Sequence, residues 1–413
     1  MLPFSEALKK ILEHCHALAV TSLPLNKLNG SVTAEATRTL FPLPRFDNSA
    51  VDGYGVKTAD LTKASETAPI TLKVIGEIAA GQSADLELAQ SGEAIRIFTG
   101  ASVPKSVDAV VMREFCRESD GSVSVESAIV HGANIRCRGA EFAQGVEVIK
   151  AHTRITPPIV GLLATLGHAE FLVHKKPRVS LVITGDELIA PGLPLANSEI
   201  YDSNSFALEA ALNDLGIDEC KKFYARDSRE QTREAFAQAL SESDVVISSG
   251  GVSVGDKDYV KEILEELDVE TIFWRIAMKP GKPVFFGTFK KAGSNHKGLA
   301  FGLPGNPVSV LVTYHQLVKP ALLRLMGLEE MTNKDQIMVL KGMLRKKVGR
   351  LDFVRAKTQV NSNGVISAIP SSKQDSHMMT GLANADCLVH FEQEAEELQD
   401  GAKITSTPIN WHG

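Results

Sequence analysis

The stretch DVVISSGGVSVGDKDY, residues 244–259, decides the fold of this chain. Val245–Ile247 is a short β-branched run, which predicts a buried strand rather than a helix. The strand runs into Ser248 and Ser249 and then into the glycine pair Gly250 and Gly251. Adjacent glycines at a strand end let the backbone approach a ligand, and successive N–H groups there can bind an anion. The stretch therefore predicts a phosphate or oxyanion site, with a tight turn before a helix as the structural alternative.

Polar residues just beyond the glycines extend this predicted site. Ser253 adds a hydroxyl group, and Asp256 and Asp258 follow two residues apart. A carboxylate in this place can hold a divalent cation that bridges phosphate oxygens. The same stretch therefore predicts a metal next to the anion.

Working outward, strands and helices alternate from residue 177. RVSLVITG (178–185) predicts a strand, and SNSFALEAALNDLG (203–216) and SREQTREAFAQALSE (228–242) predict helices. This order is typical of βαβ units that build a parallel sheet covered on both faces. Ligands of such sheets bind at the carboxyl ends of the strands.

Acidic residues follow the predicted strands at that edge. Asp186 and Glu187 follow one strand, Asp227 follows the next, and Asp258 lies beyond the glycine pair. If the sheet forms as predicted, these carboxylates converge on one site. The structural alternative is that each of them caps the helix that follows it.

Positive charge is expected from the turn in WRIAMKPGKPVFFG, residues 274–287. Arg275, Lys279 and Lys282 surround a Pro-Gly turn, and Pro280 and Pro283 fix its backbone. The turn suits a dianion, and a solvated basic loop is the alternative. Downstream, LPGNP (303–307) places Pro307 in the first turn of a long apolar helix, whose N-terminal N–H groups favour an anion.

The segments before and after this alternating region contain mainly short predicted strands. Residues 57–140 alternate with a period of two and predict a small β-rich domain, and KTQVNSNGVISAI (357–369) contains an Asn-Gly hairpin signal that predicts a small barrel or sandwich after residue 334. Candidate site residues there are Asp52 in FDNSAVDGYGV, Thr99 in RIFTGASVP, Arg136 in GANIRCRGAEF, and Arg355. Each also has an ordinary structural explanation as a turn or an exposed ion pair.

Composition excludes some classes of function. The 413 residues carry a net charge of −6, with a pI near 6.0, which argues against a general nucleic-acid binder. The 5 cysteines contain no CxxC pair, so we expect a reducing compartment, the cytoplasm, and no structural zinc. The first residues are amphipathic rather than a signal peptide, and no apolar run reaches membrane-spanning length.

The assembled motifs DNSAVDGY, RIFTGASVP, GANIRCRGAEF, TGDEL, SSGGVSVGDKDY, MKPGKP and LPGNPVS resemble, in order and spacing, those of the molybdopterin molybdenumtransferase family, MoeA, also found as the E domain of gephyrin. The resemblance covers nearly the whole chain. It implies a multidomain α/β fold: an elongated linking domain (1–45 plus 141–176), an inserted β-rich domain (46–140), an α/β molybdopterin-binding domain with a parallel-type sheet (177–330) and a C-terminal β-barrel (331–413).

The resemblance also implies an activity and its partners. The activity inserts molybdenum from molybdate into adenylylated molybdopterin (molybdopterin-AMP) and releases AMP, with a divalent cation such as Mg²⁺. It implies a homodimer whose active sites take residues from both subunits, and it is compatible with a molybdopterin adenylyltransferase and molybdoenzyme maturation proteins as partners. No nucleic acid or membrane partner is implied.

Site residues follow position by position from the same resemblance. The catalytic set is Asp52, Thr99, Glu187, Asp227, Asp258 and Lys279. The substrate-binding set is Ser249, Gly250, Gly251, Ser253, Arg136, Arg275, Lys282, Pro304, Pro307, Arg355 and Ser376. Within these sets we expect molybdate at Lys279, Lys282, Arg355 and Ser376, the metal at Asp186, Asp227 and Asp258, and Asp52 reaching in from the partner subunit.

The chain departs from the family pattern in two places. Gly139-Ala140-Glu141 stands where Gly-Glu-Asp is usual, and Arg275 stands where a lysine is common. Two other functions are kept as alternatives. One is a molybdopterin adenylyltransferase, which shares the α/β domain but does not need the β-rich domain or the barrel. The other is a non-catalytic scaffold of the same fold, against which the presence of the site residues argues.

Overall fold

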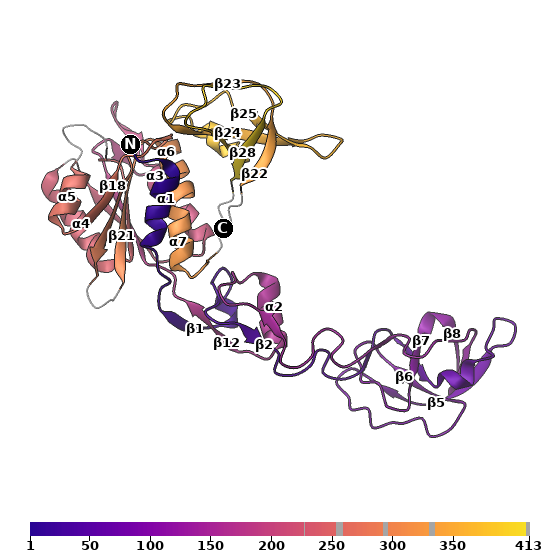
Figure 1. Cartoon of the computed structure of the whole chain (residues 1–413). Helices are drawn as coiled ribbons and strands as arrows, with labels where there is room; N and C mark the ends of the chain where they lie inside the picture. The colour runs from indigo at the N-terminus through magenta and orange to yellow at the C-terminus, as the bar shows by residue number, and fades with distance from the viewer. Residues whose placement is uncertain (227, 253–258, 292–295, 330–334, 410–413) are drawn as a thin grey trace. The chain divides into compact units, whose positions relative to one another are not determined.

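The computed structural model describes residues 1–226, 228–252, 259–291, 296–329 and 335–409. The chain divides into two compact units, one of Met1–Glu35 with Ala151–Gly413 and one of Ala36–Lys150 (Figure 1). The boundaries of the four smaller domains stay a prediction. Among the described helices, none is long and apolar enough to cross a membrane.

The larger unit is built on a 6-stranded sheet of order β16-β13-β17-β21-β20-β18. Four neighbouring strands are parallel: β16 (Cys220–Ala225), β13 (Val179–Thr184), β17 (Val245–Ser249) and β21 (Lys297–Leu303). The predicted parallel sheet is thus confirmed, and the predicted buried strand is β17. The sequence did not reveal that β20 (Phe285–Lys290) and β18 (Glu270–Trp274) add an antiparallel edge.

Helices cover both faces of this sheet (Figure 1). One face carries α4 (Arg229–Glu242) and α5 (Val260–Glu266). The other carries α1 (Phe4–Glu13), α3 (Asn204–Asp214), α6 (Pro307–Thr313) and α7 (Lys319–Leu325), the last two joined by a π-helix, Tyr314–Val318. Alternate residues of β13 enter the two cores: Leu181 and Ile183 pack on one face and Val182 on the other. Burial on both faces explains why β13 and β17 are largely apolar runs.

The rest of the larger unit consists of a linking segment and a barrel. The linking segment has the antiparallel pair β1 (Val20–Pro24) and β12 (Glu170–His174) and the helix α2 (Pro157–Thr165). In the barrel, β22 (Gln336–Leu340), β24 (Leu351–Val360), β25 (Ile366–Pro370), β26 (Cys387–Phe391) and β28 (Lys403–Pro408) close because β24 pairs with both β25 and β26. This confirms the predicted C-terminal barrel and its hairpin. Smaller elements are β19 (Met278–Lys279), which pairs with β24, β23 (Leu344–Arg345), β27 (Glu397–Leu398) and α8 (Met379–Ala383).

The smaller unit holds a 6-stranded sheet of order β7-β4-β6-β5-β9-β8. Its strands are β4 (Gly53–Val56), β5 (Ile70–Ile78), β6 (Glu93–Ile97), β7 (Ala109–Met112), β8 (Cys116–Ser119) and β9 (Ser122–Val125). Two short pairs accompany it: β2 (Thr37–Arg38) with β11 (Glu147–Ile149), and β3 (Asn48–Ser49) with β10 (Ile135–Arg136). Gly53 is required in β4, because a Cβ there would lie 2.0 Å from the Val111 carbonyl oxygen.

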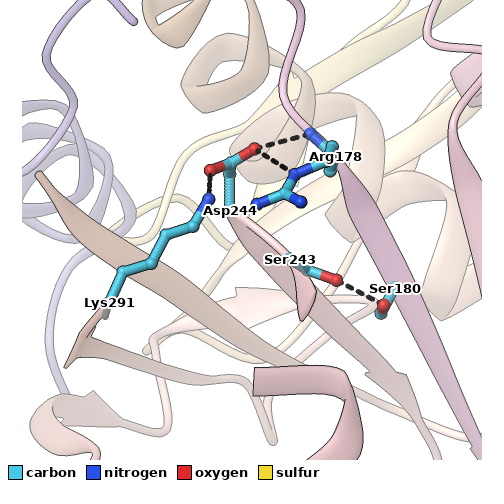
Figure 2. Close-up of polar contacts among 5 residues, drawn as sticks. All are labelled: Arg178, Ser180, Ser243, Asp244 and Lys291. Atoms are coloured by element: carbon cyan, nitrogen blue, oxygen red, sulfur yellow. Dashed lines mark hydrogen bonds and ion pairs between the residues drawn. The ribbon is translucent and has the colours of Figure 1, made fainter. Parts of the chain in front are cut away.

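An ionic cluster secures the amino end of β17, opposite the ligand edge. Figure 2 shows the Asp244 carboxylate between Arg178 and Lys291. The Arg178 backbone N–H donates to Asp244 at 2.8 Å, and the side chains of Asp244 and Lys291 are only 16% and 14% exposed. Ser180 and Ser243 share a hydrogen bond beside them (Figure 2). The cluster holds the start of β17 against β13.

We expect Asp244→Ala to lower the free energy of unfolding of the larger unit by about 3 kcal/mol, because it leaves a mostly buried lysine without its counter-charge. Calorimetric unfolding checks this. Glu13→Gln is the control: it removes an exposed pair with Lys9 whose side chains are 77% and 58% exposed, and should cost no more than about 0.5 kcal/mol. Equal losses in the two variants would show that the Asp244 cluster does not stabilise the sheet.

Candidate functional site

A pocket of about 440 Å³ lies where the carboxyl ends of β13, β17 and β21 meet. Ser249, Gly250 and Gly251 after β17 form part of its lining. Pro304 and Pro307 form another part of the wall, after β21. We call this the main pocket. Its position is the one where ligands of open parallel sheets bind.

The glycine pair after β17 has an unusual backbone conformation. Gly250 and Gly251 have φ values of 96° and 68°, which side-chain-bearing residues rarely adopt. A Cβ on Gly251 would also lie 2.6 Å from a Val260 methyl group, and one on Gly305 would lie 3.7 Å from the Gly250 Cα. The Gly250 N–H donates to the Leu303 carbonyl at 3.1 Å. Two loops therefore pack against each other and leave backbone lining the pocket.

The helix α6 begins at this pocket. Pro307 occupies its first turn, as predicted from the sequence, and Asn306 precedes it. The Val308 N–H donates to the Ser376 carbonyl oxygen at 3.1 Å, so the barrel loop that carries Ser376 contacts the start of the helix. Ser376 was predicted as a molybdate residue, and this contact places its backbone next to the pocket wall.

The basic turn adjoins the main pocket through one residue. Pro283 lines the pocket, whereas the preceding Lys282 is exposed and is not part of the lining. Lys279 is 53% exposed and lies 3.5 Å from the carboxylate of Asp352 on β24. Gly281 has a φ of 107°, and a Cβ there would meet the Thr313 hydroxyl at 2.5 Å, so the turn is fixed against α6.

Two predicted arginines occupy quite different surroundings. The Arg275 guanidinium stacks on Trp274, 3.9 Å from the ring centre, and lines an open groove beside the N-terminus rather than the main pocket. Arg355 is fully buried, and its Nη2 donates to the carbonyls of Lys373 at 2.8 Å and Asp375 at 3.3 Å. Its Nε is buried without a hydrogen-bond partner in the described part of the chain. Their roles as substrate contacts stay predictions.

Asp52 and Thr99 meet in the smaller unit. Asp52 immediately precedes β4 and Thr99 follows β6, and these strands are paired. The backbone N–H and the hydroxyl of Thr99 both donate to the same Asp52 oxygen, Oδ1, at 2.7 Å. These hydrogen bonds, with the charges of Arg113 and Arg96, hold the pKa of Asp52 below its ordinary value. Arg136, also predicted, is exposed on β10.

The predicted carboxylates are only partly described. Glu187 lines the main pocket, whereas Asp186 lines a neighbouring cavity. Asp227, Ser253 and Asp258 lie outside the described residues. Among the residues that are described, no group of three or more His, Cys, Asp or Glu side chains is arranged to hold a metal. The predicted metal site is therefore untested.

Sequence reasoning missed residues that line the main pocket at the start of α3. Asn204 donates through Nδ2 to the Ser249 hydroxyl at 2.9 Å and to the Gly305 carbonyl at 2.8 Å, which ties the two ligand loops together. Asp202 is buried and accepts a hydrogen bond from the Ser205 N–H at 3.0 Å. A polar YDSN run before a helix looks like an N-terminal cap, so only its position along the sheet edge could have indicated a site.

Fold and site together define a multidomain α/β protein with a pocket at the carboxyl edge of its sheet. Three family models cover most of the chain: the MoeA N-terminal region (domain I and II) matches residues 2–167, the probable molybdopterin binding domain 180–324, and the MoeA C-terminal region (domain IV) 338–409.

Named relatives agree with these models. A protein of Haemophilus influenzae called molybdopterin molybdenumtransferase is 36% identical over 413 residues, covering 99% of both chains. A protein of the same name from Staphylococcus aureus is 32% identical over 392 residues, covering 94% of this chain and 91% of its own. The crystal structure of a molybdopterin biosynthesis MoeA protein from Pyrococcus horikoshii matches with a TM-score of 0.76 at 32% identity, covering 99% of both chains. The chain belongs to the MoeA family of molybdopterin molybdenumtransferases.

Proposed function

We propose that this protein inserts molybdenum from molybdate into adenylylated molybdopterin and releases AMP, as a step of molybdenum cofactor biosynthesis. The observation that carries the proposal is the main pocket, where a positive-φ glycine pair and the start of α6 lie beside the basic Lys279–Lys282 turn. A phosphate-bearing pterin suits the glycine cradle. A tetrahedral dianion suits the turn.

The residues of the main pocket would bind and orient the substrate. Gly250 and Gly251 expose backbone at the phosphate end, and Asn204 holds this loop to the loop of Gly305. Carboxylate groups at Asp186, Asp227 and Asp258 would complete that end. Because the Gly250 N–H already donates to the Leu303 carbonyl, other N–H groups of this loop would bind the phosphate.

Molybdate would bind on the side of the basic turn. Lys279 and Lys282 supply the positive charge, and Ser376 approaches from the barrel through its contact with Val308. Arg355 holds the loop of residues 373–375, and its Nε, which has no hydrogen-bond partner among the described residues, would give it one further donor for an anion. This arrangement keeps two anionic substrates apart until they react.

Asp52 would enter this site from the partner subunit of a homodimer. Its Oδ1 is occupied by Thr99, and a carboxylate whose pKa is lowered keeps its negative charge. Arg136 lies in the same unit and would accompany it. The dimer itself and its shared active sites are part of the proposal.

Mg²⁺ is the proposed metal. Carboxylate oxygens are the ligands that Mg²⁺ prefers together with substrate phosphates, and Asp186, Asp227 and Asp258 would provide them. When bound, the ion would neutralise charge on the phosphoanhydride. The protein side chains would orient the phosphoanhydride.

The setting of the reaction follows from the same chemistry. We place the protein in the cytoplasm, where its cysteines, all free in the structure, remain reduced. A molybdopterin adenylyltransferase would supply its substrate, and molybdoenzyme maturation proteins would accept its product.

Incubating the purified protein with adenylylated molybdopterin, molybdate and Mg²⁺ tests the function. We expect AMP release together with a product that activates a molybdenum-free molybdoenzyme. Transfer of AMP from ATP onto molybdopterin without a second protein would instead identify an adenylyltransferase. Absence of both reactions in a folded dimer would favour the scaffold.

Thr99→Val should move the acid limb of the pH–rate profile to higher pH. The Thr99 hydroxyl is the largest cause of the lowered pKa of Asp52, so its loss lets that pKa rise toward the ordinary value. Activity that needs the carboxylate is lost as pH falls through this pKa. The variant therefore loses activity at a higher pH than the wild type. Thr99→Ser keeps the hydroxyl and should keep the wild-type profile. Identical acid limbs in wild type and Thr99→Val would count against a role for Asp52 as the carboxylate.

A further inference from the structure

A second cavity lies next to the main pocket, separated from it by a short ribbon of two strands. The ribbon consists of β14 (Leu188–Ile189) and β15 (Ile200–Tyr201), which pair in parallel. The second cavity has a volume of about 620 Å³. Both cavities fall within the range of about 300–1,000 Å³ that is typical of small-molecule sites.

Residues at the end of β13 and in the turn after it divide between the two cavities. Thr184 and Glu187 line the main pocket, whereas Ile183 and Asp186 line the second cavity. Gly185 lines both. Asp186 and Glu187 lie in the turn after β13, so this division follows from the local shape of the turn. The turn therefore acts as a partition, with a carboxylate on each side.

Gly185 is the point where the partition has no side chain. Its φ is 141°, and a Cβ there would lie 2.8 Å and 2.9 Å from the carboxylate oxygens of Glu187. Any larger residue would therefore have to displace Glu187. The backbone of Gly185 is exposed to both cavities, so an elongated ligand can cross at this residue.

The second cavity has groups that suit a nucleotide. Tyr224 on the edge strand β16 is 61% exposed, which leaves its ring available to stack on a base. Arg226 follows at the end of the same strand and presents a guanidinium group suited to phosphate. Gln231 is fixed in the lining because its Oε1 accepts a hydrogen bond from the Arg226 N–H at 3.3 Å.

We propose that the second cavity binds the adenylyl half of the substrate, so that adenylylated molybdopterin lies across Gly185 with its pterin in the main pocket and its phosphoanhydride at the turn. Asp186 and Glu187 then lie on either side of the phosphoanhydride, and AMP is released from the second cavity. The proposal rests on the proposed function and assigns the two halves of its substrate to separate cavities.

Binding measurements on the full chain with AMP and molybdopterin as separate ligands test this division. Tyr224→Ala should raise the Kd for AMP about tenfold and leave the Kd for molybdopterin unchanged. Asn204→Asp should do the reverse, because a carboxylate cannot donate to Ser249 and Gly305. Phe115→Ala is the control for loss of an exposed ring, since Phe115 is 62% exposed in the smaller unit, and should change neither Kd.

The wild-type protein should also bind AMP and molybdopterin simultaneously. Competition between the two ligands, or an Asn204→Asp variant that loses both while Tyr224→Ala loses neither, would place AMP in the main pocket and overturn the proposal. In that event the proposed function would still stand, because both ligands bind. Failure of the wild-type protein to bind either ligand would overturn both the division and the function.

Discussion

Asp52→Asn is expected to reduce the rate of molybdenum insertion about 100-fold or more without unfolding the protein. The substitution keeps the size of the side chain but removes the negative charge that the two Thr99 hydrogen bonds stabilise. Asp52 is exposed and packs into no core, so stability should hardly change. AMP release from adenylylated molybdopterin in the presence of molybdate measures the effect.

Asp120→Asn is the matched control, since Asp120 is an exposed aspartate in the same unit. It should keep the wild-type rate. Mixing Asp52→Asn chains with chains defective at Glu187 should restore part of the activity if the active site is shared between subunits. In a dimer with one chain of each kind, one of the two sites then contains both an intact Asp52 and an intact Glu187. Full activity of Asp52→Asn alone would remove Asp52 from the site.

The second large effect is expected from Lys279→Gln. Removing a positive charge next to a dianion should raise the molybdate concentration needed for half-maximal rate at least about tenfold. The Kd for adenylylated molybdopterin should change far less, because the glycine cradle is unaltered. Lys290→Gln, which removes an exposed lysine at the end of β20, is the control. Equal losses for molybdate and for the pterin would show that the division of the site is wrong.

The contact between Lys279 and Asp352 needs a separate control. Asp352 lies 3.5 Å from Lys279 and its side chain is only 12% exposed, so Lys279→Gln leaves a carboxylate that itself repels molybdate. The double variant Lys279→Gln with Asp352→Asn removes this repulsion. If it regains the wild-type use of molybdate, Lys279 acts only by neutralising Asp352; if it stays impaired, Lys279 contacts the anion.

Much of the central sheet could be predicted because its residues carry local signals. The β-branched run of β17, the glycines after it and the helix start at Pro307 each indicate their structure within a few residues. The Asn363-Gly364 turn of the barrel hairpin is also a local signal, because two adjacent residues indicate it. The antiparallel edge of β18 and β20 was missed because strand direction depends on pairing partners, which sequence periodicity does not encode.

The site was harder to predict for a similar reason. Asn204 holds two ligand loops through side-chain bonds to Ser249 and Gly305, residues 45 and 101 positions away. Arg275 has the charge expected of an anion ligand, yet its stacking on Trp274 turns it to another groove. Asp186 and Glu187 line different cavities, and the β14–β15 ribbon lies between these cavities. Such contacts arise only when the chain is folded.

Anomalous scattering from a crystal soaked with molybdate and AMP tests the central claim most directly. We predict a molybdenum peak beside the Lys279–Lys282 turn, next to the main pocket and within hydrogen-bonding reach of a lysine. A well-occupied molybdenum peak remote from that turn in every subunit, with AMP bound in the second cavity, would contradict the account.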